Sequence, residues 1–218
     1  MSHDQWQDQV DDFSPHEVAT LISHDLRSPL QVAHGRVELA KTTGDMEHLE
    51  AAERAILRVE QLLDDLTTFV REDDILGNAT PVHLETIAQL SWEMVGNESA
   101  TLRIESTQLI RADSERFQRV LENLFSNCVI HGGEDVTVRV GMLSDQDGFY
   151  VADDGDGIDQ RTMDLIFEPK FSTKSDGTGY GLPIVQRIAH AHGWSITVTT
   201  SRNGGTRFEF SDVDVIVD

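Results

Sequence analysis

Apolar residues recur at helical spacing from Phe13 to about Val70, and the pattern is broken once, at the segment KTTGDM. Residues three or four apart share one face of an α-helix, so this recurrence predicts two helices. Within the break, Gly44 and Asp45 supply a turn and the start of the second helix. The N-terminal part of the chain is therefore predicted to be a helical hairpin.

The second arm of this hairpin carries an apolar line whose steps alternate between three and four residues. Its positions are Leu49, Ala52, Ile56, Val59, Leu63, Leu66 and Val70. Such a line is typical of the seam of a helical bundle or coiled coil, which two helices alone bury poorly. We expect two copies to pair as a four-helix bundle in a homodimer, with a partner inside the same chain as the alternative.

The helical pattern ends at LGNATP, residues 76–81, where Gly, Asn and Pro interrupt it. Beyond it, helices expected at about 85–95, 114–131, 160–166 and 182–192 alternate with the β-rich runs TLRI, VTVRV, FYVAD, SITVT and RFEF. An RNGG turn joins the last two runs into adjacent strands. We predict an α+β chain with a helical hairpin over 1–75, a linker at 76–81 and a two-layer α/β sandwich over 82–218.

The composition argues against several classes of protein. No apolar run approaches the roughly 20 residues of a membrane-spanning helix, and the acidic start lacks the features of a secretion signal. The single cysteine, Cys128, excludes an internal disulfide and a multi-cysteine zinc site, so we expect a cytoplasmic protein with no membrane segment.

The net charge of -22, from 39 acidic and 17 basic residues, would repel the phosphates of nucleic acid. We therefore expect no nucleic-acid partner. Because the acidic residues are scattered along the chain, we interpret them as the surface of a protein from a high-salt cytoplasm, with a specific electrostatic role as the alternative.

The first predicted helix places a histidine opposite its apolar stripe. With about 100° per residue and Ile22 as origin, the apolar positions fall within roughly -40° to 80°, whereas His24 falls at about 200°. We therefore expect the His24 imidazole to face solvent. Pro29, one turn further on, should kink the helix. The neighbouring Asp25 could accept the proton of one ring nitrogen and leave the other as a nucleophile.

The segment DDGDGI, from Asp153 to Ile158, follows a predicted strand. Gly155 and Gly157 allow the chain to turn tightly there and to approach a ligand closely. A calcium-binding loop is the alternative interpretation. Against it, the twelfth position of such a loop is Asp164 instead of the expected glutamate, and no helix enters the motif.

Two downstream segments could bind phosphate. GTGYGL, residues 177–182, runs into a predicted helix, whose N–H groups can receive phosphate oxygens. It lacks the Lys-Ser/Thr ending of a P-loop and the glycine spacing of a dinucleotide fold. In the preceding IFEPKFSTK, Phe167 and Phe171 could anchor a loop while Thr173 and Lys174 face a phosphate, although aromatic residues at this spacing are also typical of a core.

Upstream, LENLFSNCVIHG places Asn123 and Asn127 four residues apart on one helical face. Magnesium bound to nucleotide phosphates takes only one or two protein oxygens, so this pair of amides would suffice. The alternative is an ordinary polar helix face.

Together and in this order, the SHDLRSP helix, LENLFSN, DDGDGI, IFEPKFSTK and GTGYGL resemble the sensor histidine kinases of two-component signalling, over residues 14–210. The resemblance implies that the hairpin is the dimerisation and phosphoacceptor domain and the remainder a Bergerat-type ATP-binding domain, as in gyrase and Hsp90-like ATPases. It also implies that this protein kinase uses ATP and Mg²⁺ to phosphorylate its own His24, assisted by Asp25, and then passes the phosphoryl group to an aspartate of a response-regulator receiver domain.

The resemblance further assigns the nucleotide site. Asn123 and Asn127 match the N-box, with Asn127 as the preferred magnesium ligand, and Asp153 matches the carboxylate that receives the adenine amino group. The other residues expected to contact the nucleotide are His131, Gly155, Gly157, Ile158, Phe171, Thr173, Lys174, Gly177, Thr178, Gly179, Tyr180, Gly181 and Leu182.

Two positions depart from the family pattern. Ile130 stands where the N-box usually carries Lys or Arg, so His131 or Lys174 would have to supply that phosphate contact. Ser28 stands where the family's phosphatase motif prefers Thr, Asn or Gln, which leaves open whether the protein also dephosphorylates its partner.

Two other functions are compatible with parts of the pattern. One is a non-catalytic dimeric scaffold, which Ile130 favours. The other is a gyrase-like ATPase, which needs a glutamate base where Asn123 stands, whereas Glu122 lies about 100° around the helix.

Overall fold

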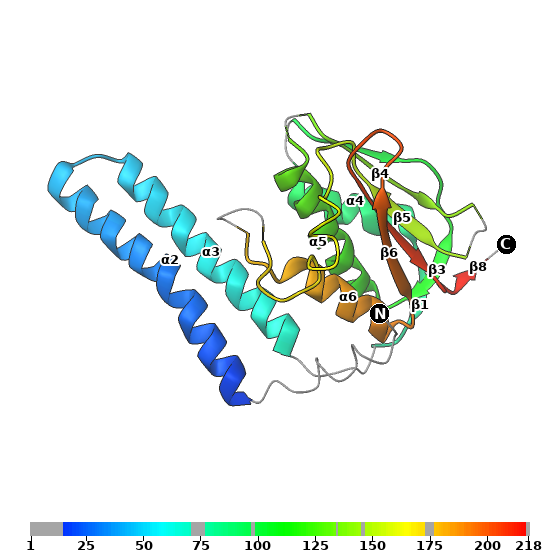
Figure 1. Cartoon of the computed structure of the whole chain (residues 1–218), viewed down its shortest axis with the longest axis horizontal. Coiled ribbons are helices and arrows are strands. Elements are labelled where there is room, and N and C mark those ends of the chain that lie inside the picture. The colour runs from blue at the N-terminus through cyan, green and yellow to red at the C-terminus, as the bar shows by residue number, and fades with distance from the viewer. Residues whose placement is uncertain are drawn as a thin grey trace. The chain divides into compact units, whose positions relative to one another are not determined.

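The computed structural model describes residues 15–70, 77–96, 99–133, 135–144, 147–172 and 177–216 (Figure 1). In the two N-terminal helices, the described side chains are those of residues 25–60, 62, 63 and 65. The chain divides into two compact units, residues 1–71 with 174–178 and residues 72–173 with 179–218.

The first unit is the predicted hairpin. Helix α2 (Pro15–Thr43) and helix α3 (Glu47–Val70) pack along each other in opposite directions (Figure 1). Gly44 adopts a φ of 71° in the turn, a left-handed conformation that glycine tolerates well. Asp45 Oδ1 accepts a hydrogen bond of 3.0 Å from the Glu47 amide, so Asp45 caps α3 as expected of a residue at a helix start. Helix α2 continues without interruption through Pro29.

The contact between α2 and α3 is made largely by small side chains. The buried apolar residues of the hairpin include Ala33, Ala52, Ala55 and Leu62. Three of the five described positions of the line expected on α3 are not buried by this contact, because Leu49, Ile56 and Leu63 are 41%, 48% and 44% exposed. The side chains of Leu66 and Val70, which complete that line, lie outside those described.

The second unit contains two sheets. Strands β1 (Thr80–His83), β3 (Leu109–Ala112) and β8 (Val215–Ile216) form a small antiparallel sheet in the order β1-β3-β8. Strands β2 (Thr101–Ile104), β4 (Thr137–Met142), β5 (Phe149–Ala152), β7 (Thr206–Ser211) and β6 (Ser195–Thr200) form the main sheet in the order β2-β4-β5-β7-β6. Only the β2–β4 pair of the main sheet is parallel.

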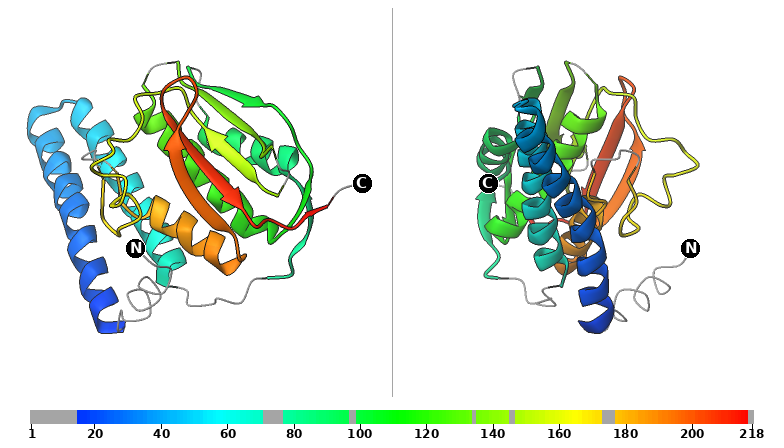
Figure 2. Two further views of the ribbon diagram at one scale, coloured as in Figure 1. Left: turned by 45° about the vertical axis from the view of Figure 1, so that its right-hand side comes forward. Right: turned by 90° about the vertical axis from the view of Figure 1, so that its left-hand side faces the viewer.

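Helices α4 (Leu84–Val95), α5 (Ser114–His131) and α6 (Gly181–Ala191) cover one face of the main sheet, as Figure 2 shows. Aromatic rings fill the space between the layers: Phe149 and Phe210 stack at 4.6 Å between ring centroids, and Phe117 of α5 meets Phe149 edge to face at 5.2 Å. This arrangement confirms the predicted α+β fold with its α/β sandwich.

The prediction of a helix at 160–166 is wrong. This stretch forms successive turns whose amides bond three residues back: Thr162 to Asp159, Leu165 to Thr162 and Glu168 to Leu165, at 2.8 to 2.9 Å. The Asp159 side chain accepts from the Arg161 amide at 3.0 Å and so favours a turn over a continuing helix.

The small sheet was not expected from the sequence. Two positions of the segment predicted as a linker, Thr80 and Pro81, belong to β1, where they lie opposite Ala112 and Arg111 of β3. Pro81 is tolerated because β1 is an edge strand of its sheet.

No helix in the described part of the chain is both long enough and apolar enough to cross a membrane.

Candidate functional site

The site is built around a carboxylate at the end of a buried strand. All four residues of β5 are buried, and Asp153 follows them with 5% of its surface exposed. Its Oδ1 accepts hydrogen bonds from the amides of Gly155, at 2.9 Å, and Thr206, at 3.2 Å. Burial raises the pKa of Asp153, while these amide donors and a nearby thiol act in the opposite direction.

The second oxygen of this carboxylate faces helix α5. Cys128, which is 3% exposed, donates from Sγ to Asp153 Oδ2 over 3.7 Å. Burial, followed by the adjacent negative charge of Asp153, raises the pKa of the Cys128 thiol well above its ordinary value. The thiol therefore stays protonated and acts as a hydrogen-bond donor instead of a nucleophile.

Glycines allow three backbone segments to meet around Asp153. A Cβ at Gly155 would lie 2.4 Å from the Cα of Gly132, which follows α5. A Cβ at Gly205 would lie 2.3 Å from Asp153 Oδ1, and the φ of Gly205 is 67°. Gly157 has a φ of 74°, and a Cβ at this position would lie close to the carbonyl oxygen of Gly205. Side chains at these positions would fill the space beside the carboxylate.

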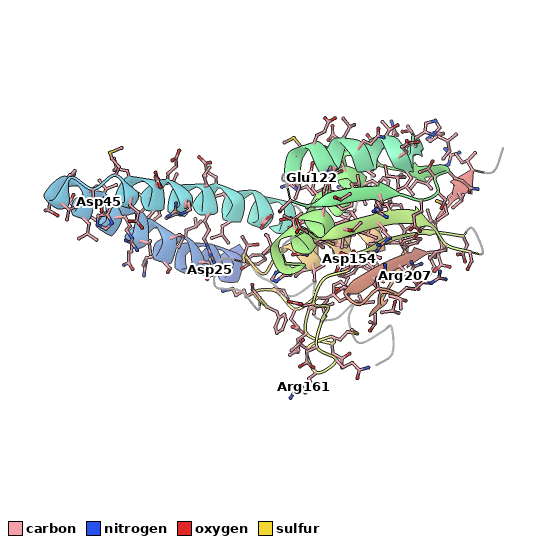
Figure 3. All side chains as sticks on the ribbon, turned by 90° about the horizontal axis from the view of Figure 1, so that it is seen from above. Asp25, Asp45, Glu122, Asp154, Arg161 and Arg207 are labelled. Carbon is pink, nitrogen blue, oxygen red and sulfur yellow. The ribbon has the colours of Figure 1, made fainter. Side chains whose placement is uncertain are left out.

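The neighbouring carboxylate, Asp154, is held by protein groups. Its Oδ1 accepts from the Thr137 amide at 2.6 Å, and its Oδ2 lies 3.6 Å from Nη2 of Arg139 (Figure 3). Burial opposes ionisation of Asp154, but the Thr137 amide and Arg139 outweigh it and lower the pKa. Asp153 is only 5% exposed and both oxygens of Asp154 are engaged by protein groups, which argues against a calcium-binding loop. The described residues include no group of three or more His, Cys, Asp or Glu side chains that could hold a metal.

Helix α5 carries the two predicted asparagines. It begins where Asp113 Oδ1 accepts from the amides of Glu115 and Arg116, at 3.1 and 3.2 Å, which is the bonding expected of an N-cap. Asn123 Nδ2 donates to the Arg119 carbonyl at 2.9 Å, and its Oδ1 would lie 2.8 Å from a Cβ at Gly181. Asn127 Nδ2 is buried without a hydrogen-bond partner among the described groups.

The second glycine segment is joined to the loop before it. The Lys170 amide donates to the Gly179 carbonyl at 2.9 Å, and a Cβ at Gly179 would lie 2.5 Å from the backbone of Lys170. Helix α6 begins two residues later, at Gly181, against Asn123 of α5. Tyr180 is only 1% exposed, so its side chain is packed inside the second unit.

Other residues expected at the site have mixed outcomes. Ile158, Phe171 and Leu182 of the second unit are half-buried, as is His131 at the end of α5. Gly177 and Thr178 belong to the short segment grouped with the first unit. Thr173 and Lys174 lie outside the described residues, and so does the side chain of His24. Asp25 is half-buried on α2 (Figure 3).

Three features that hold Asp153 in place were not expected from the sequence: the Cys128 thiol, the Thr206 amide and the close approach of Gly205. Cys128 directly follows Asn127 in the sequence, and Gly205 belongs to the RNGG turn, so both stood next to features that had been recognised. Their pairing with Asp153 comes from strand order, which the local pattern does not reveal.

Glu122, the position considered for a gyrase-like base, is occupied within its own helix. Its Oε1 accepts from Nε2 of Gln118 at 2.8 Å, one turn earlier (Figure 3). This bond is an ordinary pair between residues four apart on a helix.

Two parts of the chain match known protein families. Residues 16–75 match the His Kinase A (phospho-acceptor) domain, and residues 112–215 match the histidine kinase-, DNA gyrase B-, and HSP90-like ATPase family. The sensor histidine kinase ZraS of Klebsiella oxytoca is 30% identical over 208 residues, which cover 88% of this chain and 45% of the relative. The methanogenesis regulatory histidine kinase FilI of Methanothrix harundinacea is 29% identical over 203 residues, which cover 85% of this chain and 23% of the relative. The chain thus spans less than half the length of these relatives.

Solved structures share the fold. The Acinetobacter baumannii histidine kinase AdeS matches with a TM-score of 0.65 and 20% identity, over 86% of this chain and 97% of that one. Histidine kinase ThkA, solved in complex with the response regulator protein TrrA, matches with a TM-score of 0.69 and 19% identity, over 91% and 61%. Full-length ShkA in complex with AMPPNP matches with a TM-score of 0.62 and 23% identity, over 94% and 47%.

Proposed function

Because the chain belongs to the sensor histidine kinases of two-component signalling, we propose that it phosphorylates its own His24 from ATP and passes the phosphoryl group to a response-regulator receiver domain. The division into a phosphoacceptor hairpin over 1–75, a linker at 76–81 and an ATP-binding domain over 82–218 is part of this proposal. One observation carries it: helix α5 meets both the buried carboxylate of Asp153, through Cys128, and the second glycine segment, through Asn123.

In the proposed site, Asp153 accepts the exocyclic amino group of adenine. Its Oδ1 is already satisfied by two amides, so the carboxylate is fixed before the base arrives. Gly155, Gly157 and Ile158 shape the space beside it. Three glycines, Gly177, Gly179 and Gly181, let the backbone of the second segment approach the phosphates, with Phe171, Thr173, Lys174, Thr178, Tyr180, Leu182 and His131 as the remaining contacts.

The amides of α5 fit a magnesium ion bound to the nucleotide. Asn127 Nδ2 is buried without a described partner, and as an N–H donor it suits a phosphate oxygen, which leaves the amide oxygen of Asn127 for the metal. Asn123 donates its own N–H to Arg119, which leaves its oxygen at Gly181. Asn127, with Asn123 as the second group, would hold the ion, which neutralises charge on the phosphates when it is bound.

The transfer itself needs a neutral imidazole. One ring nitrogen of His24 attacks the γ-phosphorus of ATP, an N–P bond forms, the P–O bond to ADP breaks, and Asp25 takes the proton from the other ring nitrogen. Positioning supplies most of the rate, since the three reacting atoms must lie in line. The receiver aspartate then attacks the phosphohistidine, which restores the imidazole.

We also propose that the hairpin dimerises. Leu49, Ile56 and Leu63 lie seven residues apart and form an exposed apolar line on α3, and Leu30 and Leu39 of α2 are 50% and 45% exposed. A second hairpin would bury such a line as the seam of a four-helix bundle. Ile56→Glu should dissociate the dimer in sedimentation experiments, whereas Leu57→Glu, one position off the line, should leave it intact. Equal behaviour of the two variants would remove this part of the proposal.

The kinase proposal is tested by incubating the whole chain with γ-labelled ATP and Mg²⁺. We expect acid-labile label on the protein, its loss in His24→Gln, and its retention in His34→Gln, which replaces an exposed histidine further along the same helix. Label on the wild type should move to a purified receiver domain from the same organism, and should not move when the aspartate of that domain is replaced by Asn.

The alternatives give different results in this assay. Nucleotide binding with no labelled protein would favour the non-catalytic scaffold. Free phosphate formed at the same rate by wild type and His24→Gln would favour the gyrase-like ATPase. The bond between Glu122 and Gln118 already speaks against that ATPase, since the carboxylate would have to leave its partner to act as a base.

A further inference from the structure

The carboxylate of Asp153 is almost fully engaged by the protein itself. An ionised carboxylate offers about four acceptor sites, two on each oxygen. The Gly155 and Thr206 amides occupy Oδ1, at 2.9 and 3.2 Å, and the Cys128 thiol occupies one site of Oδ2, at 3.7 Å. Among the described groups, one acceptor site on Oδ2 is therefore left for a ligand.

We propose that Cys128 is a positioning residue for nucleobase recognition: its thiol fixes Oδ2 of Asp153 so that the last acceptor site of the carboxylate receives the amino group of adenine. This inference rests on the proposed function, because it assumes that Asp153 faces the base. It goes further by assigning to this chain's only cysteine a role in the choice of nucleotide.

Three features support a donor role over simple space filling. Cys128 comes from a different element than the two amide donors, so the carboxylate is held from both sides: by the loop after β5 together with the start of β7, and by α5. Cys128 is only 3% exposed, so water does not compete for the hydrogen bond that the thiol donates. The contact also links Asp153 to the helix that carries Asn127, the residue directly before Cys128. Base recognition and phosphate recognition then share one rigid support.

The test compares two nucleotides on the whole chain by calorimetry with Mg²⁺. ATP carries the 6-amino group, and purine riboside triphosphate lacks it but keeps the ring and the phosphates. The ratio of their dissociation constants measures recognition of the amino group alone. We expect Cys128→Ala to reduce the preference for ATP by roughly threefold to tenfold, as for loss of one weak hydrogen bond to a charged group, and to leave binding of the purine analogue unchanged.

Val120→Ala is the matched control for packing. Val120 lies on the buried face of α5, eight residues before Cys128, and is fully buried. This variant should lower the melting temperature without changing the preference for ATP. A Cys128→Ser variant keeps a hydrogen-bond donor, but on a shorter side chain. Its preference for ATP should be weaker than that of wild type and stronger than that of Cys128→Ala. A melting curve like that of wild type would show that this variant is folded.

A double-mutant cycle separates positioning from a direct contact with the base. Asp153→Asn should abolish most of the preference for ATP, and adding Cys128→Ala to it should then change nothing further, because the thiol acts through the carboxylate. Additive losses would overturn the proposal, as would an unchanged preference in folded Cys128→Ala. If the wild type binds no ATP, the proposed function fails together with this inference. If the wild type binds ATP and becomes labelled on His24 while Cys128→Ala keeps the full preference, this inference alone fails.

Discussion

Replacing Gly205 by alanine should damage the nucleotide site more than replacing its neighbour, Gly204. Both glycines have positive φ, 67° and 88°, so an alanine at either one costs about 1 to 2 kcal/mol of backbone strain. The two positions differ in the space around the new methyl group. At Gly205 it would lie 2.3 Å from Asp153 Oδ1 and 2.5 Å from the Asp153 carbonyl oxygen, whereas at Gly204 its nearest neighbour is the Gly155 carbonyl oxygen at 3.7 Å.

The clash forces the carboxylate of Asp153 away from the Thr206 amide, which bonds it at 3.2 Å. Loss of a hydrogen bond to a buried charged group costs about 1.5 to 3 kcal/mol. Added to the strain, this predicts that Gly205→Ala lowers the free energy of unfolding by about 3 to 5 kcal/mol, against about 1 to 2 kcal/mol for Gly204→Ala.

The same displacement should weaken ATP binding, because the acceptor moves away from the base. A loss of about 1.5 to 3 kcal/mol of binding free energy in Gly205→Ala would raise the dissociation constant of ATP by roughly 10-fold to 100-fold. For Gly204→Ala, the dissociation constant should stay within about twofold of the wild-type value. Urea unfolding and calorimetry with ATP and Mg²⁺ measure the two effects. If Gly205→Ala binds ATP as well as Gly204→Ala does, Asp153 is not the group that receives the base.

Three further predictions concern the support of the site and the surface. Asp113→Ala removes the cap of α5 and should cost about 1 to 2 kcal/mol in urea unfolding, whereas Asp113→Asn, which can still cap, should cost a few tenths; equal losses would mean that the cap bonds contribute nothing. The His192 side chain accepts from the Asp113 amide through Nε2, and burial lowers the pKa of His192, so stability should fall as the pH drops below about 6.5 toward the folded pKa; His192→Gln should flatten that slope and His190→Gln should not. Finally, the net charge of -22 predicts a melting temperature that rises with KCl up to about 1 M, and a flat dependence would contradict self-repulsion at the surface.

Much of the fold follows from local pattern in the sequence. Apolar spacing predicts helices α2, α3, α4, α5 and α6. Helix α5 begins and ends at the predicted residues, because Asp113 caps its start and Gly132 follows its end. The helix prediction for 160–166 is wrong because the apolar spacing there is typical of a helix, whereas hydrogen bonds to Asp159 and Thr162 form turns instead. Strand β1 was not predicted for another reason: it contains Pro81 and begins in the segment interpreted as a linker.

The candidate site divides in the same way. The glycines of DDGDGI and GTGYGL could be found from the sequence because tight turns and close approaches require glycine locally, whereas the role of Asp153 came from the family resemblance. Cys128 and Thr206 could not, because their contacts with Asp153 span 25 and 53 residues and depend on β5 pairing with β7 and on α5 packing across the sheet. An ordinary small apolar residue and an ordinary strand amide become functional only through that topology.

Helix α5 is the element on which these contacts converge. It begins at the Asp113 cap, presents Asn123 to the second glycine segment and Cys128 to Asp153, and ends where Gly132 meets Gly155. A ligand that contacts both Asp153 and the second glycine segment would therefore contact two groups that are held by the same helix, α5. Since any ligand that binds only the folded state stabilises it by mass action, ATP should protect the amides of α5 from hydrogen exchange more than those of α4, which carries none of these contacts in the described part of the chain. Equal protection of the two helices would show that α5 does not link the base to the phosphates.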